Sequence, residues 1–541
     1  MEIGLSNDIP TYAGGLGVLA GDVIRTSADL QLPLVAVTLV CKNGYCKQRI
    51  LNRDIVSRPI EWDPSKHLAL QQPTVNVVLQ GRDVNVKAWT CEVKGRTGGV
   101  VQTLFLDTNS VENDPNDREI TSFLYGGDQK YRLKQEMILG IGGVKMLDAL
   151  GYRVRKYHMN EGHCAFVALE LLRRHGMRAD EVRDLCAFTM HTPVEYGHDK
   201  FPYEVVKEVV GNYVPFDVLQ TFGGCDEFNL TLLGLSLSGY INGVGKKHKD
   251  VSKRMFSSHK INTITNGVHS YTWTCESMRK LFDQYLPGWA NDPALLARVD
   301  IIPDEAIWQA HKSAKTQLID YVNEMTASDL DYDTFTIGFA RRATAYKRAN
   351  LIFSDLEQLK RVNEKGRMQL IFSGKAHIRD ESGRMIIQEI LDSIDKLSGE
   401  IKVVYLEDYD MEIASKLVSG VDVWLNTPLP PFEASGTSGM KAAHNGVINF
   451  SVLDGWWIEG WIENVTGWAI GPRPEKVVSN EDRWRREIDD LYHKLGYVII
   501  PQFYGARKDW IVMMKNSIGK LAYYFNSHRM MLHYVLEAYF R

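Results

Sequence analysis

The sequence lacks the long apolar run that a membrane-spanning helix requires. A helix that crosses a bilayer needs about 18 or more consecutive apolar residues, and no stretch of the 541 residues provides them. The start of the chain also lacks the basic segment and following apolar segment that mark a secretory signal. We therefore expect no membrane partner and a cytoplasmic location.

Paired cysteines are also missing. The seven cysteines are an odd number without CxxC spacing, at positions 41, 46, 91, 164, 186, 225 and 275. Disulfide frameworks and zinc sites use paired cysteines at short, defined spacings. We therefore interpret these residues as reduced thiols and predict no metal site.

The chain has little excess charge of either sign. Its 63 Lys and Arg residues nearly balance 67 Asp and Glu residues, which gives a net charge of -4. Nucleic-acid-binding domains carry a strong positive excess, so we expect no nucleic-acid partner. The length, with an apolar content of 44%, instead predicts an enzyme-sized globular protein of two or three domains.

Glycines open the first recognisable element. Tyr12-Ala-Gly-Gly-Leu-Gly17 precedes apolar residues at helical spacing up to Leu30, and a β-branched run follows at 34–40. This order predicts a loop, a helix and a strand of α/β type. Gly14 and Gly15 would let backbone N–H groups approach a phosphate, although a lone glycine pair is also ordinary turn chemistry.

The first half of the chain also contains strand signals. Alternating apolar residues at 75–90 predict a hairpin, and apolar runs predict strands at 100–107, 157–160 and 186–190. His191 and Thr192 follow the last of these strands, and α/β proteins bind ligands at the carboxyl ends of parallel strands. A structural histidine remains the alternative interpretation of His191.

A second α/β pattern follows the acidic segment at 329–333. Apolar runs at 334–340, 368–373, 401–405 and 421–425 alternate with helical segments. Strand–helix–strand repetition predicts a parallel, doubly wound sheet. We expect domains at 1–328 and 329–515, with a helix at 516–541 that returns to the first domain.

Four cations follow the first strand of that pattern, in the sequence Arg341-Arg342-Ala-Thr-Ala-Tyr346-Lys347-Arg348. Such a cluster is stable on a solvated helix face or around an anion. At a strand end we favour phosphate, because guanidinium groups pair with phosphate oxygens in bidentate fashion and lysine adds a point charge.

The segment Glu433-Ala-Ser-Gly-Thr-Ser-Gly-Met-Lys441 resembles a helix entry built for an anion. Its small residues leave backbone N–H groups accessible. A lysine in an apolar pocket can condense with an aldehyde, as pyridoxal phosphate enzymes do. An ordinary helix cap followed by a surface lysine is the alternative interpretation of these residues.

In this order, these segments resemble those of the α-glucan (glycogen, starch, maltodextrin) phosphorylases. A further match is Thr265-Asn-Gly-Val-His269, with Trp273 shortly after it. The resemblance covers nearly the whole chain but not the long N-terminal regulatory region of many members. We therefore expect a short form without phosphorylation switching or nucleotide allostery.

The resemblance implies two doubly wound Rossmann-like lobes that face a central cleft, the glycosyltransferase-B type of α/β fold. It implies phosphorolysis of terminal α-1,4-linked glucosyl units by orthophosphate, which releases glucose 1-phosphate with retention. Pyridoxal 5'-phosphate would form a Schiff base with Lys441 and act through its phosphate. The partners would be an α-1,4-glucan and orthophosphate, and we leave a homo-oligomer open.

The resemblance also implies roles for individual residues. The implied catalytic residues are Arg342, Lys347 and His191. The implied cofactor-binding residues are Lys441, Thr437, Ser438, Arg341, Tyr409, Trp273 and Gly15. The implied substrate-binding residues are Gly14, Gly15, Asn266, Glu433, Ser435, Gly436 and Thr192.

Two positions depart from the family pattern. Arg341 replaces the usual lysine, and Asp410 follows Tyr409 where many members have arginine. The tryptophans at 456, 457 and 461 indicate buried packing, with a sugar-stacking surface as the alternative.

Three other functions compete with phosphorolysis. A nucleotide-sugar-dependent glucan synthase would share the fold but would not need Lys441. A glycan-binding protein would not need Arg342 and Lys347, and an unrelated pyridoxal enzyme such as an aminotransferase would use Lys441 in its chemistry.

Overall fold

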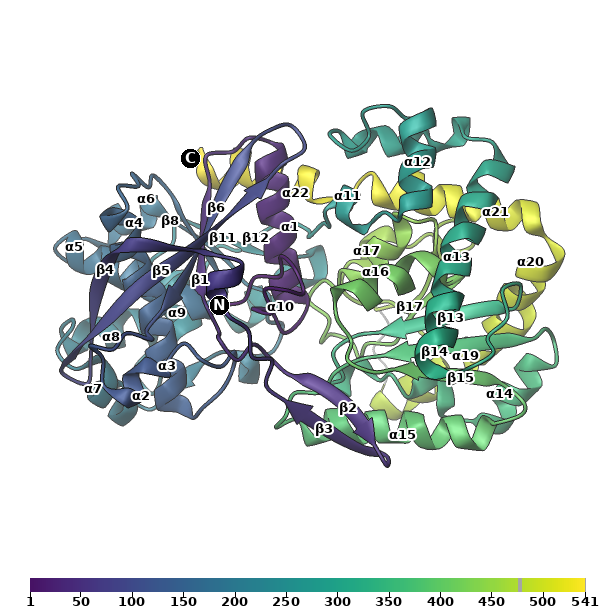
Figure 1. The fold of residues 1–541 in the computed structure, drawn as a ribbon, viewed down its shortest axis with the longest axis horizontal. Coiled ribbons are helices and arrows are strands. Elements are labelled where there is room, and N and C mark those ends of the chain that lie inside the picture. The colour runs from purple at the N-terminus through teal and green to yellow at the C-terminus, as the bar shows by residue number, and fades with distance from the viewer. Residues whose placement is uncertain (475–478, 541) are drawn as a thin grey trace. The chain divides into compact units, whose positions relative to one another are not determined.

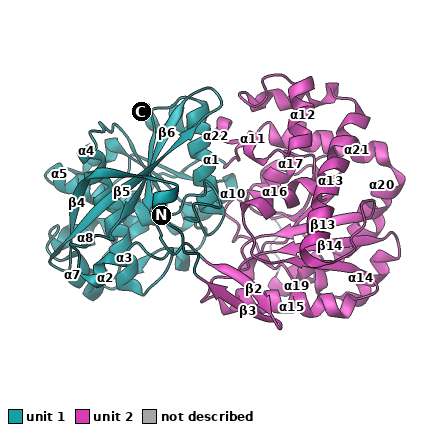
Figure 2. Cartoon of the chain, viewed as in Figure 1, with its two compact units in different colours: residues 1–45, 59–265, 530–541 teal, residues 46–58, 266–529 magenta. Residues whose placement is uncertain are grey.

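The computed structural model describes residues 1–474 and 479–540, which form two compact units (Figure 1, Figure 2). The first unit contains Met1–Tyr45, Pro59–Thr265 and the residues from 530 onward. The second contains Cys46–Arg58 and Asn266–Arg529. These limits differ from the boundary expected at 328/329, which falls inside the second unit after helix α13 (Asp304–Thr326).

The second unit is built on a six-stranded sheet in which every pairing is parallel. Its order is β15 (Lys402–Leu406), β14 (Met368–Ser373), β13 (Phe335–Ala340), β16 (Val423–Asn426), β17 (Ile448–Val452) and β18 (Gly467–Ile470). The strand order reverses between β13 and β16, and ligands of such sheets bind at the carboxyl ends of the strands beside this reversal. Both strands are fully buried, as expected for a sheet covered on both faces.

The helices of the second unit pack against this sheet or against one another (Figure 1). They are α11 (Ser270–Trp273), α12 (Glu276–Tyr285), α13, α14 (Leu356–Asn363), α15 (Glu381–Leu397), α16 (Met411–Gly420), α17 (Ser438–Ala443), α18 (Trp457–Gly460), α19 (Asn480–Lys494), α20 (Ile500–Gly505) and α21 (Arg507–Asn516). The hairpin of β2 (Lys47–Leu51) and β3 (Asp54–Arg58) also belongs to this unit. Trp456 and Trp457 are 4% and 1% exposed, which confirms buried packing for these two tryptophans.

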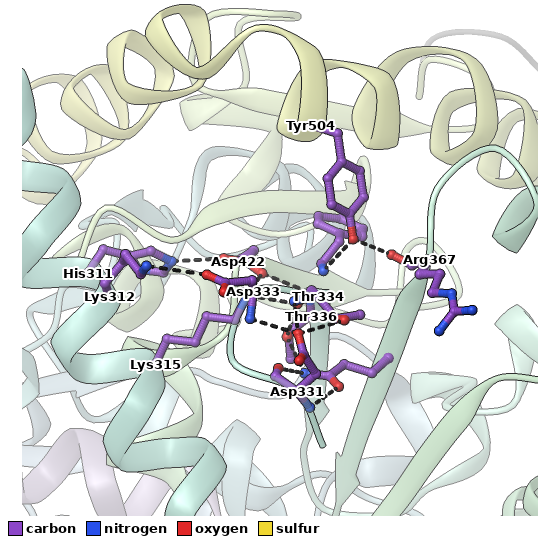
Figure 3. Close-up of polar contacts among 12 residues, drawn as sticks. His311, Lys312, Lys315, Asp331, Asp333, Thr334, Thr336, Arg367, Asp422 and Tyr504 are labelled. Carbon is purple, nitrogen blue, oxygen red and sulfur yellow. Dashed lines mark hydrogen bonds and ion pairs between the residues drawn. The ribbon is translucent and has the colours of Figure 1, made fainter. Parts of the chain in front are cut away.

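A buried acid fixes α13 to the amino ends of β13 and β16 (Figure 3). Asp422, at 1% exposure, accepts hydrogen bonds from His311 Nε2 at 2.9 Å and from Lys315 Nζ at 2.6 Å. The backbone N–H of Thr336 donates to the same carboxylate at 2.8 Å. Asp422 and its partners lie at the amino ends of the strands, whereas Arg341 and Arg342 lie at the carboxyl ends. We therefore assign the Asp422 network to the stability of the fold.

The first unit contains two four-stranded sheets. One is parallel, with the order β12 (Asn262–Thr263), β11 (Tyr240–Gly243), β8 (Cys186–Thr189) and β7 (Tyr157–Asn160). The other is mixed, with the order β1 (Val35–Leu39), β6 (Val100–Asp107), β5 (Arg82–Lys94) and β4 (Ala69–Leu79). The predicted hairpin at 75–90 is confirmed as part of the antiparallel pair β4–β5.

The helices of the first unit pack around these sheets. They are α1 (Gly15–Asp29), α2 (Pro115–Arg118), α3 (Gln129–Met137), α4 (Gly143–Ala149), α5 (Phe166–Arg174), α6 (Ala179–Leu185), α7 (Tyr203–Val210), α8 (Phe216–Gly223), α9 (Leu230–Ser236) and α10 (Lys246–Met255). The end of the chain joins this unit after α22 (Ser527–Tyr534) begins: Tyr539 Oη lies 2.6 Å from His158 Nδ1.

The predicted α/β class with parallel sheets is confirmed. Within residues 1–474 and 479–540, we find no helix with both the length and the apolar content that a bilayer crossing demands.

Candidate active site

A buried carboxylate lies between two of the predicted phosphate-binding cations. Glu433 Oε2 is 2.7 Å from Arg341 Nη2 and 2.5 Å from Lys347 Nζ, and all three side chains are at most 11% exposed. Arg341 directly follows β13, at the point where the strand order reverses. The structure therefore brings Arg341, Lys347 and Glu433 to one point, although the first and the last are 92 positions apart in the chain (433 minus 341).

The charges of this trio are mutually dependent. Burial would raise the pKa of Glu433, but the positive charges of Arg341 and Lys347 outweigh burial and the pKa is lowered. Burial, together with the neighbouring charge of Arg341, lowers the pKa of Lys347 to about 7. Lys347 can thus lose its proton close to neutral pH, and a second anion beside it would favour the charged form.

The remaining cations of the cluster differ in their surroundings. Arg342 is exposed, and its charge also depresses the pKa of Lys347. Arg348 instead serves the fold, since its guanidinium donates to the carbonyl oxygens of Thr427 and Pro428 at 2.9 Å each. It also pairs with Glu487 at 2.6 Å.

The loop that carries Glu433 is held by Asp454, which sequence reasoning did not single out. Asp454 Oδ2 accepts a hydrogen bond from the backbone N–H of Glu433 at 2.9 Å. Burial raises the pKa of Asp454 to about 7, with the negative charge of Glu433 adding to the effect. Gly436, at φ 71°, passes so close to the trio that a Cβ there would lie 3.4 Å from Arg341 Nη2.

Lys441 lies in the short helix α17 and faces Trp273. The lysine residue is 6% exposed, and its Nζ is 3.6 Å from the centre of the Trp273 ring. The structure therefore brings together the two residues that the sequence assigned to one cofactor. The hydroxyl of Ser438 accepts from Trp424 Nε1 at 3.0 Å, whereas Thr437 makes no side-chain cap on the helix.

Hydrogen bonds join the segment around Trp273 to α17. Asn445 Nδ2 donates to the carbonyl oxygens of Trp273 and Lys441, at 2.7 and 3.0 Å. The backbone N–H of Cys275 donates to Asn445 Oδ1 at 2.8 Å. These bonds fix Trp273 against the helix that carries the lysine.

Asn266 begins this same segment of the second unit. It is 3% exposed, and its Oδ1 has no hydrogen-bond partner among the described residues. Its backbone carbonyl accepts from Arg529 Nη2 at 3.1 Å. A buried acceptor without a partner costs free energy, which is consistent with a ligand that donates to it.

Tyr409 and Ser435 lie near the group of Arg341, Lys347 and Glu433, whereas Asp410 has a separate role. Burial raises the pKa of Tyr409 while the charge of Arg341 opposes the rise, so these two residues interact. Ser435 is buried, and its carbonyl oxygen accepts from the backbone N–H of Trp456 at 2.8 Å. Asp410 caps α16 by accepting from the backbone N–H of Ile413 at 2.9 Å, which accounts for an acid at this position.

In the first unit, His191 and Thr192 follow β8 as predicted. His191 Nε2 lies 2.9 Å from Asn160 Oδ1, and Glu161 Oε2 accepts from the His191 backbone N–H and the Thr192 hydroxyl, each at 2.9 Å. Burial lowers the pKa of His191 to about 3, helped by the neighbouring His248. His191 is therefore neutral at physiological pH, and an uncharged ring can accept or donate a single hydrogen bond at each nitrogen.

The glycine loop of the first unit is held by an acid. Glu2 Oε2 accepts from the backbone N–H groups of Ala13 and Gly14, at 2.6 and 3.1 Å. The Gly14 N–H is therefore already used. A Cβ at Gly14 or Gly15 would meet nothing within 4 Å, so open space surrounds both positions.

One further cluster in this unit has metal-ligand residue types: Glu136, His163 and Asp199. Arg132 already contacts it, at 3.0 Å from Glu136 Oε1 and 3.1 Å from Asp199 Oδ2. A guanidinium at these distances supplies the positive charge that a metal ion would bring, so we assign the cluster to an internal ion-pair network.

Comparison with known proteins gives a consistent result. A family model described as carbohydrate phosphorylase matches residues 218–468. The chain is 38% identical to a maltodextrin phosphorylase of Thermococcus litoralis, over 100% of this chain and 70% of the relative. It is 36% identical to a glycogen phosphorylase of Aquifex aeolicus, over 99% of this chain and 85% of the relative. A protein of Methanocaldococcus jannaschii described as uncharacterised is 30% identical over 100% and 98% of the two chains.

Proposed function

The chain belongs to the carbohydrate phosphorylase family, and from this membership we propose that it is an α-glucan phosphorylase. An oxygen of orthophosphate forms a bond to C1 of the terminal α-1,4-linked glucosyl unit, and the C1–O bond to the next unit breaks. The departing 4-oxygen takes up a proton that originates on the phosphate. The products are glucose 1-phosphate, with the anomeric configuration retained, and a glucan shortened by one unit.

The observation that carries this proposal is the pairing of Arg341 and Lys347 with buried Glu433. Two buried cations at a strand end form a site for anions, and Glu433 serves as their internal counterion. We infer that orthophosphate is held by Lys347 and by the exposed Arg342, and that Arg341 lies near the cofactor phosphate. Fixed positive charges in a water-poor site stabilise developing negative charge by several kcal/mol.

The residues around Lys441 fit pyridoxal 5'-phosphate. A buried amine faces an aromatic ring, and glycine at 436 leaves space beside Arg341 that a larger residue would fill. We propose that Lys441 anchors the cofactor, that Trp273 packs against it, and that Thr437, Ser438, Tyr409, Arg341 and Gly15 bind it. When bound, the cofactor would supply a phosphate group that can donate and accept protons, and the protein's own residues would hold it in place.

The glucosyl unit is assigned to residues with buried or neutral polar groups. We propose that the residues that bind it are His191, Thr192, Gly14, Asn266, Glu433, Ser435 and Gly436. The unpartnered Oδ1 of Asn266 supports this assignment, because a sugar hydroxyl can donate to it. The protein would act in the cytoplasm, in line with the sequence-based expectation.

Phosphate-dependent turnover tests the reaction directly. Purified protein is incubated with pyridoxal phosphate, maltodextrin and orthophosphate, and glucose 1-phosphate is measured. We expect release that requires orthophosphate and that Lys347→Ala lowers by at least tenfold, since one buried charge contact is lost. Release of free glucose without phosphate, or transfer from a nucleoside diphosphate glucose instead, would support a hydrolase or the glucan synthase alternative.

Borohydride reduction followed by peptide mapping tests the cofactor assignment. We expect a reduced pyridoxyl group on Lys441 and none in Lys441→Arg. Lys416, a partly exposed lysine in α16 that pairs with Glu412, provides the matched control, and Lys416→Arg should label like the wild type. Labelling that persists in Lys441→Arg would place the cofactor elsewhere.

A further inference from the structure

A strained backbone position lies beside His191, in the loop after β7. Glu161 has φ 70° and ψ 169°, a combination that is essentially restricted to glycine. Residues in such conformations persist only where the surrounding structure holds them, and they gather at functional sites. We therefore expect the Glu161 side chain to make contacts that hold this backbone conformation.

The carboxylate of Glu161 fixes the segment that carries His191. Its Oε2 accepts hydrogen bonds from the His191 backbone N–H and from the Thr192 hydroxyl, each at 2.9 Å. Glu161 is only 5% exposed, and no lysine or arginine within 1–474 and 479–540 forms an ion pair with it. The buried acid is thus held by hydrogen-bond donors of the His191 segment instead of by a cation.

The neighbouring residue, Asn160, determines the proton position on the His191 ring. Its Oδ1 lies 2.9 Å from His191 Nε2, and an amide oxygen can only accept. Nε2 must therefore carry the ring proton, and Nδ1 keeps a free lone pair. The titratable groups that face the ring are His158, His163 and His248, together with Glu161.

We propose that Asn160 and Glu161 are positioning residues for His191. Asn160 fixes the Nε2-protonated tautomer, and Glu161 fixes the backbone of His191 and Thr192. As a result, Nδ1 accepts a hydrogen bond from a hydroxyl of the terminal glucosyl unit. This inference rests on the proposed function, because that function supplies the sugar. Neither Asn160 nor Glu161 contacts the substrate itself.

Nitrogen NMR of the protein with ¹⁵N-labelled histidine rings reads the tautomer without any turnover. Protonated and unprotonated ring nitrogens give well-separated signals, and His191→Gln identifies the pair that belongs to His191. We expect an unprotonated Nδ1 in the wild type and a mixture of both tautomers in Asn160→Ala. A wild-type His191 with its proton on Nδ1 would overturn the proposal.

Asn160→Asp supplies a pH signature that a merely structural role would not produce. A carboxylate facing Nε2 favours the imidazolium form and raises the pKa of His191. For this variant, kcat/KM with maltodextrin should fall as the pH is lowered through the raised pKa, because Nδ1 then carries a proton and cannot accept. Asn160→Ala should lose about tenfold at every pH, the value of one hydrogen bond. A profile of Asn160→Asp parallel to that of Asn160→Ala would contradict the assignment.

The variant Glu161→Gly removes the side chain of Glu161 and with it the backbone strain at this position. Glycine relieves the backbone strain, but it leaves the His191 N–H and the Thr192 hydroxyl without their acceptor. These two effects oppose one another, so the melting temperature should change little while kcat/KM falls by tenfold or more. Met177, at φ 65° and on the surface of the same unit, is the matched control, and Met177→Gly should keep full activity. Glu161→Gln keeps an acceptor oxygen and should retain more activity than Glu161→Gly. A fully active Glu161→Gly variant would contradict the positioning role of Glu161.

The measurements distinguish this inference from the proposed function. If the wild type releases no glucose 1-phosphate, the proposed function fails, and the NMR and melting data still decide whether Asn160 and Glu161 fix His191. If the wild type turns over normally with the other tautomer, only the positioning role fails.

Discussion

At the scale of single residues, Lys347 makes the candidate phosphate site sensitive to pH. Its pKa is lowered to about 7 by burial and by the charge of Arg341, so its ammonium is charged below pH 7 and neutral above it. Sulfate is a suitable probe because it does not titrate in this range. We expect the affinity for sulfate, measured by calorimetry, to fall as the pH rises from 6 to 8.

The matched variant for this prediction is Lys347→Arg. A guanidinium stays protonated throughout, so the variant should bind sulfate with an affinity that hardly changes between pH 6 and 8. If both proteins showed the same decline, another group would be responsible, and Lys347 would not be the titrating residue.

The sequence indicates which residues are candidates for the site, but it does not indicate which of them contact one another. The family resemblance assigns Lys441 and Trp273 to the same cofactor. It assigns Arg341, Lys347 and Glu433 to the site one by one, without a contact between them. It could not show that Glu433 is the counterion of Arg341 and Lys347, because that contact depends on how the loop after β16 returns to the end of β13. Asp410 departs from the arginine that many family members have after the tyrosine. The helix that follows explains it, because an aspartate directly before a helix is a common cap.

At the scale of elements, the position of α17 depends on Gly439. A Cβ at Gly439 would overlap Asn449 Oδ1 and Trp456 Cζ2, so an added methyl group must displace the helix that carries Lys441. We expect Gly439→Ala to lower stability by about 1–3 kcal/mol and to reduce the absorbance that the proposed cofactor, pyridoxal phosphate, gives when it is added to the protein.

Gly505, in α20 of the same unit, is the matched control because a Cβ there meets nothing within 4 Å. Gly505→Ala should bind the cofactor like the wild type. Full cofactor binding by Gly439→Ala would show that α17 tolerates the shift and would remove this constraint on Lys441.

The buried network of Asp422 gives a prediction for stability without an effect on chemistry. Asp422→Ala leaves Lys315 and His311 buried without their acceptor (Figure 3), and the loss of one partner from a buried pair costs about 3–5 kcal/mol. The melting temperature should drop, while kcat/KM of the folded protein stays unchanged. Asp333, an exposed partner of Lys312, is the control, and Asp333→Asn should melt like the wild type.

The strands were predictable where the sequence is continuously apolar, and missed where it is short or interrupted. β13 to β16 were predicted within two residues of their ends. β17 (Ile448–Val452) carries Asn449 and Ser451, which break the apolar run, and β18 (Gly467–Ile470) has only four residues and starts with glycine. Both strands form because neighbouring strands pair with them, which local sequence does not encode.

At the scale of the whole molecule, a buried or partly buried carboxylate holds three of the candidate binding segments, each within its own unit. Glu2 holds the glycine loop, Glu161 holds the His191 segment, and Glu433 pairs with Arg341 and Lys347. The first two accept from backbone N–H groups of the first unit, whereas Glu433 neutralises cations in the second. The His191 segment of the first unit thus offers neutral groups that suit sugar hydroxyls, whereas the Arg341–Lys347 cluster of the second unit offers cations that suit phosphate oxygens.

Hydrogen–deuterium exchange can test this division of roles across the chain. Orthophosphate alone should protect the backbone amides of 341–348 and 433–441, because a ligand stabilises the segments that bind it, and should leave 186–192 unchanged. A maltooligosaccharide alone should protect 186–192. The segment around β2 and β3, which carries none of the assigned residues, is the internal control and should exchange alike in both cases. Protection of 186–192 by orthophosphate alone would contradict the division, since it would mean that the His191 segment responds to phosphate without any sugar.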